Sequence, residues 1–509
     1  MKLTILQILV LFQANLIAAQ TSLGEINLEN GKYNVGFRHY TTADSTRTYS
    51  RIFDYTNKKI VRPIPVSIWY PSEQNVVNSE PLRVLDYLEM LKEEEEWEHL
   101  PNEQILNWFY YSNTPANQKH LVEQTTAYTK AEFAKGKFPV IVYAPSYQAS
   151  SIENFALCEY LASHGFVVVS GPSRGTETRW FSNNNAKEME TQARDVEFLM
   201  KEAGKFPITD YDKIAVMGFS FGGLSNIIVQ NRNGNVKAIV SLDGTERYQY
   251  ELLNQSPFFA AQKIDVPYIH MAQKDIPGIV LKEDNINPEL NTKFQLFDSL
   301  SRSKAYRLKF HNLTHSYFST LGILFEKRDE RQDKSDPEIM ESYKWASIYT
   351  LNFLNATLNK DKNALRFIEN NPSDNGITNS LITLQTKQPE KDAFTFQDFN
   401  DLASNRNYET LLQCYDSITR MYSAFEIPES NLNTLGLQLV FNPDTSEQGI
   451  NVFLLATKLY PDSANLYDSL AEGYLVMGNK EKAIESFEKS LELNSRNQNA
   501  INRLEQLRE

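Results

Sequence analysis

Cysteine is almost absent from this chain, which has only Cys158 and Cys414 in 509 residues. Two cysteines cannot supply the disulfide framework on which small extracellular domains depend. The two residues lie far apart, in segments with helical patterns. We therefore expect two buried thiols and no disulfide, even in an oxidising compartment.

Positive charge is also scarce, since 51 Lys and Arg residues stand against 64 Asp and Glu residues and give a formal net charge of -13. This balance argues against a nucleic-acid partner and against electrostatic binding to anionic membranes. It sets no limit on an uncharged ester substrate.

Long apolar runs are missing beyond the N-terminus, so we predict no transmembrane span in the mature chain. The N-terminus itself has Lys2, an apolar stretch over 3–11, and Ala18 and Ala19 before Gln20. That stretch is too short to cross a bilayer, and the small residues suit signal-peptidase cleavage. Residues 1–20 are predicted to be a signal peptide that directs the protein to the periplasm or out of the cell.

The most informative feature that is present is a Gly-x-Ser-x-Gly motif at 218–222, centred on Ser220. An apolar run over 214–217 precedes it and a helical pattern follows it. This arrangement is typical of a nucleophile elbow, in which a strand turns sharply into a helix and raises the serine hydroxyl above the sheet. The two glycines are needed because strand and helix approach too closely for a β-carbon.

A serine nucleophile needs a histidine and an acid, which in this type of site follow it in the order acid, then histidine. Of seven histidines, four precede the motif: His39, His99, His120 and His164. His270 lies in an apolar segment typical of a buried strand and is expected to be satisfied by the backbone. His315 lies deeper in a polar loop than His311, which we interpret as a solvated strand-end residue. We therefore favour His315 as the base.

Two carboxylates are candidates for the acid. Asp243 ends the first predicted strand after the motif, and Asp275 follows the next predicted strand by four residues. Either could fix the imidazole tautomer and stabilise the imidazolium that forms during acylation. Spacing alone does not choose between them.

Six stretches carry a family resemblance: Val66–Ser72, Thr114–Asn117, Leu161–Val168, Gly218–Gly223, Leu242–Asp243 and the loop at His315. Through them, residues from about 50 to 320 resemble the platelet-activating-factor acetylhydrolases, within the dienelactone-hydrolase-like part of the α/β-hydrolases. The resemblance implies an α/β-hydrolase fold, a mostly parallel sheet with helices on both faces. It also implies Asp243 as the acid, with Asp275 as the alternative, and chemistry that needs no cofactor or metal ion.

The chain departs from this family at two places. Phe219 stands before the serine where histidine is usual, and the oxyanion loop, usually His-Gly, is Ala144–Gln148. An oxyanion hole needs backbone N–H groups and no particular side chain, so Phe221 and Tyr147 are predicted to supply the two donors. Pro145 cannot donate.

The order of strand and helix signals predicts a catalytic domain over 21–371, a linker over 372–392 and a small all-α domain over 393–509. A helix is expected over 345–358. Six core strands are expected, at 138–143, 166–170, 214–217, 238–242, 268–271 and 306–310.

An insertion over about 82–130 interrupts this pattern with one helix, marked by Leu85, Leu88 and Leu91, and an aromatic cluster over 105–111. It is open whether the cluster simply packs on the sheet or walls the acyl pocket. If it walls the pocket, the predicted pocket residues are Trp108 and Phe109, together with Phe219.

The final region has the spacing of a tetratricopeptide repeat, a 34-residue pair of helices. One clear repeat is predicted over 464–497, with its turn at Gly478 and Asn479, and a degenerate one over 430–463. Such a module predicts a protein partner or self-association.

Together these features predict a secreted serine esterase that hydrolyses small carboxylic esters, of short-acyl or phospholipid type. Two alternatives remain open: a degenerate hydrolase whose repeats bind a protein, and a serine peptidase on the same fold.

Overall fold

A computed structural model describes residues 21–56, 58–73, 80–283, 285–327, 333–378, 380–389, 394–422 and 425–508. The predicted signal peptide over 1–20 lies outside the described residues. The chain divides into two compact units, Met1–Pro389 and Glu390–Glu509. Within the described residues, no helix is both long and apolar enough to cross a membrane.

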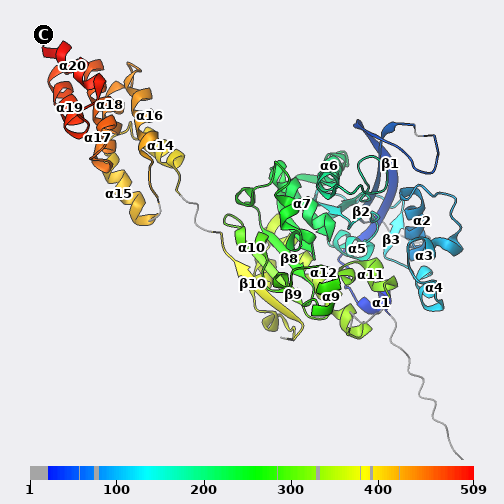
Figure 1. Ribbon diagram of the computed structural model, residues 1–509. Coiled ribbons are helices and arrows are strands. Elements are labelled where there is room, and N and C mark those ends of the chain that lie inside the picture. Colours follow the sequence, from blue (N-terminus) through cyan, green and yellow to red (C-terminus); the bar gives the residue numbers. More distant parts are fainter. Residues whose placement is uncertain are drawn as a thin grey trace, which may run out of the picture. The chain divides into compact units, whose positions relative to one another are not determined.

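The first unit contains a ten-stranded sheet in the order β10-β9-β8-β7-β6-β4-β5-β2-β1-β3 (Figure 1). The six central strands of this order, β9-β8-β7-β6-β4-β5, each run parallel to their neighbours, as in a mostly parallel α/β sheet. They confirm the six core strands predicted from the sequence. Their bounds are β4 Phe138–Ala144, β5 Val167–Ser170, β6 Thr209–Phe219, β7 Val236–Leu242, β8 Tyr268–Ala272 and β9 Ala305–Phe310.

Helices cover both faces of this sheet, because successive side chains of a buried strand point to opposite faces. In β4, Ile141 and Tyr143 join one core cluster and Val140 and Val142 the other. Helices α5 (Phe155–Ser163) and α12 (Asp336–Leu358) pack on the first face, and α6 (Asn185–Ala203) and α7 (Phe221–Arg232) on the second. The helix expected over 345–358 is the second half of α12, and Cys158 of α5 is a buried free thiol.

One edge of the sheet is built by long strands that the sequence did not predict. β1 (Asn34–Tyr49) pairs antiparallel with β2 (Ile60–Ser72), and β3 (Ala127–Thr129) lies beyond them. Much of β1 is polar and exposed, so it lacks the apolar pattern of a core strand. The insertion packs near this edge with α2 (Val84–Glu94), which is the helix expected from its leucines, a 3-10 turn η1 (Asn102–Gln104), α3 (Ile105–Trp108) and α4 (Pro115–Leu121).

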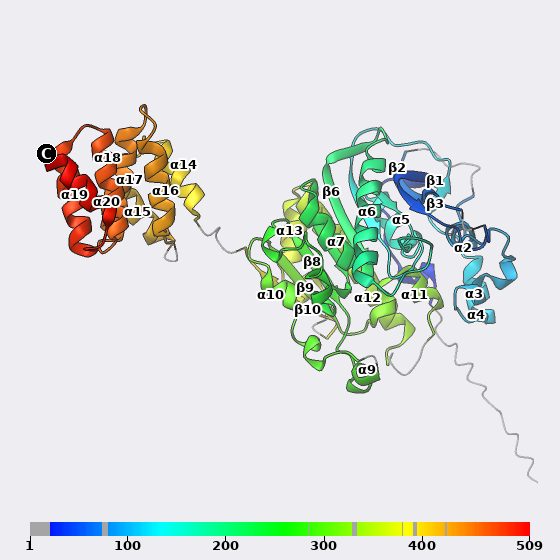
Figure 2. The ribbon, with the colours of Figure 1, turned by 45° about the horizontal axis from the view of Figure 1, so that its top comes forward.

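The other edge corrects the predicted linker. Residues 372–389 belong to the first unit, because β10 (Ile382–Lys387) pairs antiparallel with β9 after the short turn η6 (Pro372–Asn375). Figure 2 shows β8, β9 and β10 side by side at this edge. The strand is mostly polar and partly exposed, which is why its sequence looks like a linker.

Shorter elements complete the first unit around this sheet. They are α1 (Leu23–Ile26), η2 (Thr245–Arg247), α8 (Tyr250–Leu253), η3 (Ala261–Lys263), α9 (Gly278–Glu283), η4 (Pro288–Asn291), α10 (Gln295–Ser299), η5 (His315–Phe318), α11 (Thr320–Phe325) and α13 (Lys362–Glu369).

The second unit is entirely helical among its described residues. Its helices are α14 (Phe396–Ser404), α15 (Leu411–Met421), α16 (Glu429–Val440), α17 (Ser446–Leu459), α18 (Ala464–Val476), α19 (Lys480–Leu493) and α20 (Gln498–Arg508). Small residues lie where helices cross: a β-carbon at Gly436 would clash with the ring of Phe453. Gly478, at φ +73°, forms the turn between α18 and α19, where the sequence predicts it. The assignment of these pairs to the tetratricopeptide family stays a prediction.

Candidate active site

Ser220 occupies a strained turn between β6 and α7. Its backbone has φ 53° and ψ -119°, which an L-residue adopts only when the surrounding structure imposes it. A β-carbon at Gly218 would clash with the backbone of Gly222, and one at Gly222 would clash with the carbonyl of Ala144. Both glycines are therefore required by direct backbone contact.

The structure brings Ser220, His315 and Asp243 together, as the sequence predicts for the site. The Ser220 hydroxyl lies 2.8 Å from Nε2 of His315, and Nδ1 of the same ring lies 2.6 Å from Oδ2 of Asp243. Asp243 follows β7 and His315 begins η5 just after β9. One imidazole thus connects a hydroxyl to a carboxylate, in the arrangement that activates serine nucleophiles.

The Asp243 carboxyl is fully buried, yet it is held in its charged form. Burial alone would raise its pKa. The hydrogen bond and charge of His315, and to a smaller extent the charge of Arg247, hold the pKa below its ordinary value. Its second oxygen, Oδ1, accepts a hydrogen bond from the backbone N–H of Gln273 at 2.9 Å. Asp243 is therefore an ionised acceptor with a fixed orientation.

The alternative candidates have other partners. Asp275 is largely exposed and forms an ion pair with Lys309 at 2.6 Å, and His311 Nε2 lies 2.7 Å from the Thr383 hydroxyl on β10. His270 is buried in β8, as its sequence predicts. However, its Nδ1 lies 2.9 Å from the hydroxyl of Ser241 and 3.2 Å from the side chains of Tyr268 and Glu246, so side chains and not the backbone contact this nitrogen.

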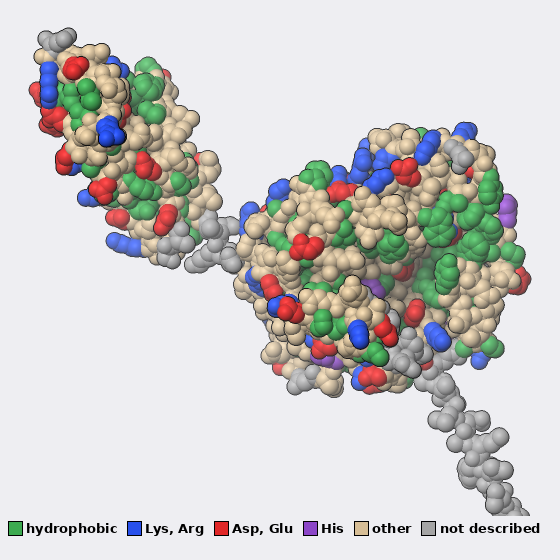
Figure 3. Space-filling model, viewed as in Figure 1, with side chains coloured by type: hydrophobic (Ala, Val, Ile, Leu, Met, Phe, Trp, Pro, Cys, Tyr) green, Lys and Arg blue, Asp and Glu red, His purple; other side chains and the backbone are tan. Residues whose placement is uncertain are grey.

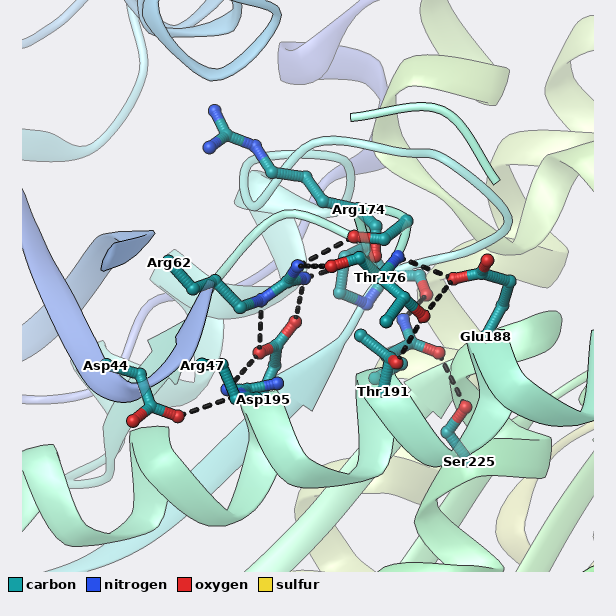
Figure 4. A network of polar contacts seen from close by, with 12 residues as sticks. Asp44, Arg47, Arg62, Arg174, Thr176, Glu188, Thr191, Asp195 and Ser225 are labelled. Carbon is teal, nitrogen blue, oxygen red and sulfur yellow. Dashed lines mark hydrogen bonds and ion pairs between the residues drawn. The ribbon is translucent and has the colours of Figure 1, made fainter. Parts of the chain in front are cut away.

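The oxyanion loop over 144–148 is tied to both neighbouring helices through Gln192 of α6. The Gln192 amide donates to the carbonyl of Pro145 at 2.8 Å and accepts from the Ser225 hydroxyl of α7 at 2.7 Å. Figure 4 shows the surrounding network, in which Asp195 of the same helix binds Arg62. Sequence reasoning missed Gln192 because a polar helix residue carries no local signal of a contact 47 positions away.

Glu153 holds the next residue of the loop. Its buried carboxylate accepts from the backbone N–H of Ser146 at 2.8 Å and from the hydroxyl of the same residue, and Tyr143 donates at 3.2 Å. Burial raises the pKa of Glu153 to about 7, although the Ser146 hydrogen bonds oppose the rise. The Glu153 carbonyl also accepts from the N–H of Leu321 at 3.1 Å, so one residue joins the oxyanion loop to the segment after His315.

Two backbone donors remain for an oxyanion. Phe221 is the first residue of α7, and its N–H therefore has no acceptor within the helix. The Tyr147 N–H has no hydrogen-bond acceptor in the described part of the chain. The two rings contact edge to face, with centroids 5.8 Å apart, which places the loop beside the start of the helix.

Two cavities open near these residues. The first, about 550 Å³ and here called the aromatic cavity, is lined by the oxyanion loop residues Ser146–Gln148 and by rings of the insertion, Trp108–Tyr111, with Phe53 and Trp180. The second, about 740 Å³ and here called the histidine cavity, is lined by His315, Thr245, Tyr248, Gln249, Gln273 and the segment after β8. Figure 3 shows this face of the unit hollowed, with hydrophobic side chains gathered on one side of the hollow.

The three predicted pocket residues fall in different places. Trp108 and Phe109 line the aromatic cavity. Trp108 also stacks on Trp97, with centroids 4.7 Å apart, so the insertion both packs and forms a cavity wall. Phe219 lines neither cavity: it is buried, and its ring lies 5.0 Å from that of His315.

Comparisons with known proteins agree with this fold. Residues 125–321 match the dienelactone hydrolase family. No curated protein sequence matches the chain significantly. Among solved structures, the chain is similar to a ferulic acid esterase from Streptomyces cinnamoneus, with a TM-score of 0.50 and 17% identity over 71% of this chain and 98% of that one. These findings support an α/β-hydrolase fold.

Proposed function

We propose that this chain is a serine hydrolase that cleaves carboxylic esters through an acyl-enzyme on Ser220. The observation that carries the proposal is the unbroken chain of hydrogen-bond distances from Ser220 through His315 to the buried Asp243. The family match and the esterase-like fold support the ester as the bond attacked.

Each residue has a defined role in this reaction. His315 Nε2 takes the proton of Ser220 as its oxygen attacks the ester carbonyl, and Asp243 stabilises the imidazolium that results. The N–H groups of Phe221 and Tyr147 bind the oxyanion. His315 then gives the proton to the leaving alcohol, and water releases the acid by the same steps in the second half of the cycle.

The aromatic cavity is the proposed site of the acyl group. It is lined by the oxyanion loop, which must lie against the acyl carbonyl, and it does not include His315. Its aromatic rings favour an apolar or aromatic acyl chain, since burying such groups against rings is favourable. The similar ferulic acid esterase is named for an aromatic acid, so feruloyl esters belong in a substrate panel beside short-acyl and phospholipid-type esters.

A degenerate hydrolase is the main competing function. An inactive scaffold has no need to keep a strained serine, an imidazole and a buried ionised acid within hydrogen-bond distance of one another. These three features therefore favour an active enzyme. We further propose that the protein is exported through its N-terminal segment and that the helical unit binds a protein partner or a second copy.

A fluorophosphonate probe tests the proposal directly. We expect full-length protein to become covalently labelled on Ser220 and to hydrolyse 4-nitrophenyl esters, with preference set by acyl length or aromaticity. Ser220→Ala is the matched control and should show neither signal. Labelling of another residue would remove Ser220 as the nucleophile, and no labelling together with no turnover of any ester would assign the chain to the degenerate class.

A further inference from the structure

The histidine cavity begins beside the nucleophile. Thr245, which lines it, donates its backbone N–H to the carbonyl of Ser220 at 2.9 Å, and His315 lines it as well. None of the oxyanion loop residues takes part in its lining. The cavity therefore meets the reacting centre on the side where His315 delivers its proton, away from the site proposed for the acyl group.

Its inner wall is polar and ordered by hydrogen bonds. The backbone N–H of Gln273 orients Asp243, while the side-chain amide of Gln273 donates to the Tyr248 hydroxyl at 3.0 Å. Gln249 lies exposed on the same wall. Such amide and phenol groups both donate and accept hydrogen bonds, as ligand hydroxyls require.

Four charged side chains besides His315 line this cavity, two basic and two acidic: Lys274, Lys327, Asp275 and Glu326. Lys274 forms an ion pair with Asp333, and Asp275 forms one with Lys309, each at 2.6 Å. The two signs balance and leave little net charge to attract an ionic ligand, whereas the neutral amide and phenol groups favour an uncharged one.

The outer wall is a preformed structure. Ile276, Val280 and Leu281 form a small core of their own, and Figure 2 shows the helix α9 that carries two of them standing out from the rest of the unit. The buried Arg247 fixes this wall, because its Nε donates to the carbonyl of Leu290 at 2.9 Å and its Nη2 to that of Asn291 at 3.1 Å. A wall held in this way can bind a ligand without first having to fold.

We propose that the histidine cavity binds the alcohol half of the ester and selects an uncharged, hydroxyl-rich alcohol such as glycerol or a sugar. The inference rests on the proposed esterase function, since it assigns the two halves of the ester to the two cavities. Its chemical basis is that the leaving oxygen must lie within reach of Nε2 of His315 to be protonated. About 740 Å³ is ample for a monosaccharide and for part of a longer chain.

A subsite for the leaving alcohol also binds an incoming one. A hydroxyl of a bound polyol attacks the acyl carbonyl on Ser220 and gives its proton to His315 Nε2. The bond between Ser220 Oγ and the acyl carbon then breaks, and that proton returns to Oγ. The product is a polyol ester in place of the free acid, and no other reactant is needed.

Partitioning of the acyl-enzyme tests the subsite. Full-length protein is acylated with 4-nitrophenyl acetate in the presence of increasing methyl glucoside or glycerol, and the ratio of polyol ester to acetate is measured. We expect this ratio to saturate with the polyols but to rise only linearly with cyclohexanol, which has a similar size and one hydroxyl. Saturation with cyclohexanol alone, or linear dependence for all three, would overturn the proposal.

Variants locate the effect. At low polyol concentration, the ratio of polyol ester to acetate rises in proportion to the polyol concentration. Tyr248→Phe and Gln249→Leu should each lower this initial slope at least fivefold, relative to the slope measured with cyclohexanol. Tyr250→Phe, a neighbouring tyrosine outside the cavity, is the matched control and should leave the ratio unchanged. If nitrophenol is released normally but the substitutions leave the ratio unchanged, the alcohol subsite is rejected and the esterase function stands. If the native protein releases no nitrophenol, both proposals are rejected.

Discussion

The two cavities beside Ser220 are built from different parts of the chain and have different chemistry. The strand that leads to Ser220, β6, lies between β4, which leads to the oxyanion loop, and β7, which leads to Thr245 and the histidine cavity. One cavity takes its rings from the insertion, and the other takes amides and a phenol from loops after β7 and β8. Under the proposed assignment of acid and alcohol to the two cavities, this difference means that recognition of each half can be changed separately, while one nucleophile serves both.

The largest effect should come from the nucleophile that the cavities share. Ser220→Ala leaves a side chain that fits the elbow but removes the attacking oxygen, and loss of a triad nucleophile typically costs about 10⁴ to 10⁶ in rate. Steady-state rates should fall by this amount for every acyl and every alcohol, with an unchanged circular dichroism spectrum. Retention of more than a few per cent of activity would remove Ser220 from the mechanism.

The acid should rank second. Asp243→Asn should slow turnover by about 10⁴, because an amide cannot hold the imidazole in the required tautomer. Asp275→Asn is the matched control, since Asp275 lies on the rim of the histidine cavity and pairs with Lys309. We expect it to have a small effect, and the reverse ranking would transfer the role of the acid to Asp275.

Glu153, which binds the oxyanion loop, should make the stability of the fold depend on pH. Its pKa of about 7 in the fold lies above the ordinary 4.5, so its contribution to stability is full below pH 4.5 and is lost as pH rises through 7. The titratable groups near its carboxyl are the side chains of Tyr143, Tyr111 and His315. A shift of this size corresponds to at most about 3 kcal/mol.

Glu153→Gln keeps the shape but cannot titrate. We expect the melting temperature of the native protein to fall between pH 5 and pH 8, and that of the variant to fall distinctly less. Equal slopes for the two proteins would show that Glu153 keeps its ordinary pKa in the fold.

Trp108 offers a smaller and more selective change. Trp108→Ala should alter the preference among acyl groups by about 1 to 3 kcal/mol, because it removes apolar contact from the aromatic cavity. The same variant should keep the native preference among polyols in the partitioning assay. A uniform loss over all acyl groups with a lower melting temperature would mean that its stacking on Trp97 is its main role.

The smallest effect is expected from removing the helical unit. Both cavities and the Ser220 site lie within the first compact unit, so a chain ending at Pro389 should fold and hydrolyse small esters at nearly the native rate. Size-exclusion chromatography of the same protein tests whether the helical unit drives self-association.

A second truncation sharpens this result. A chain ending at Asn371 also loses β10, which pairs with β9 and contacts His311, and it should melt at a lower temperature than the chain ending at Pro389. A folded but inactive chain ending at Pro389 would show that the helical unit helps to build the site.

Local sequence determined the centre of the molecule. The apolar runs of the six core strands and the glycines around Ser220 are features of short segments, and each predicted strand is present. These signals are strong because a buried strand must be apolar and a sharp elbow must have glycine, whatever the rest of the chain does.

Tertiary structure decided the remainder. It placed Asp243 and not Asp275 against His315, left Phe219 outside both cavities, and made residues 382–387 an edge strand where the sequence suggested a linker. It also recruited Glu153 and Gln192 to hold the oxyanion loop. These outcomes depend on contacts between residues distant in the sequence, and a polar side chain carries no local sign of which distant partner will satisfy it.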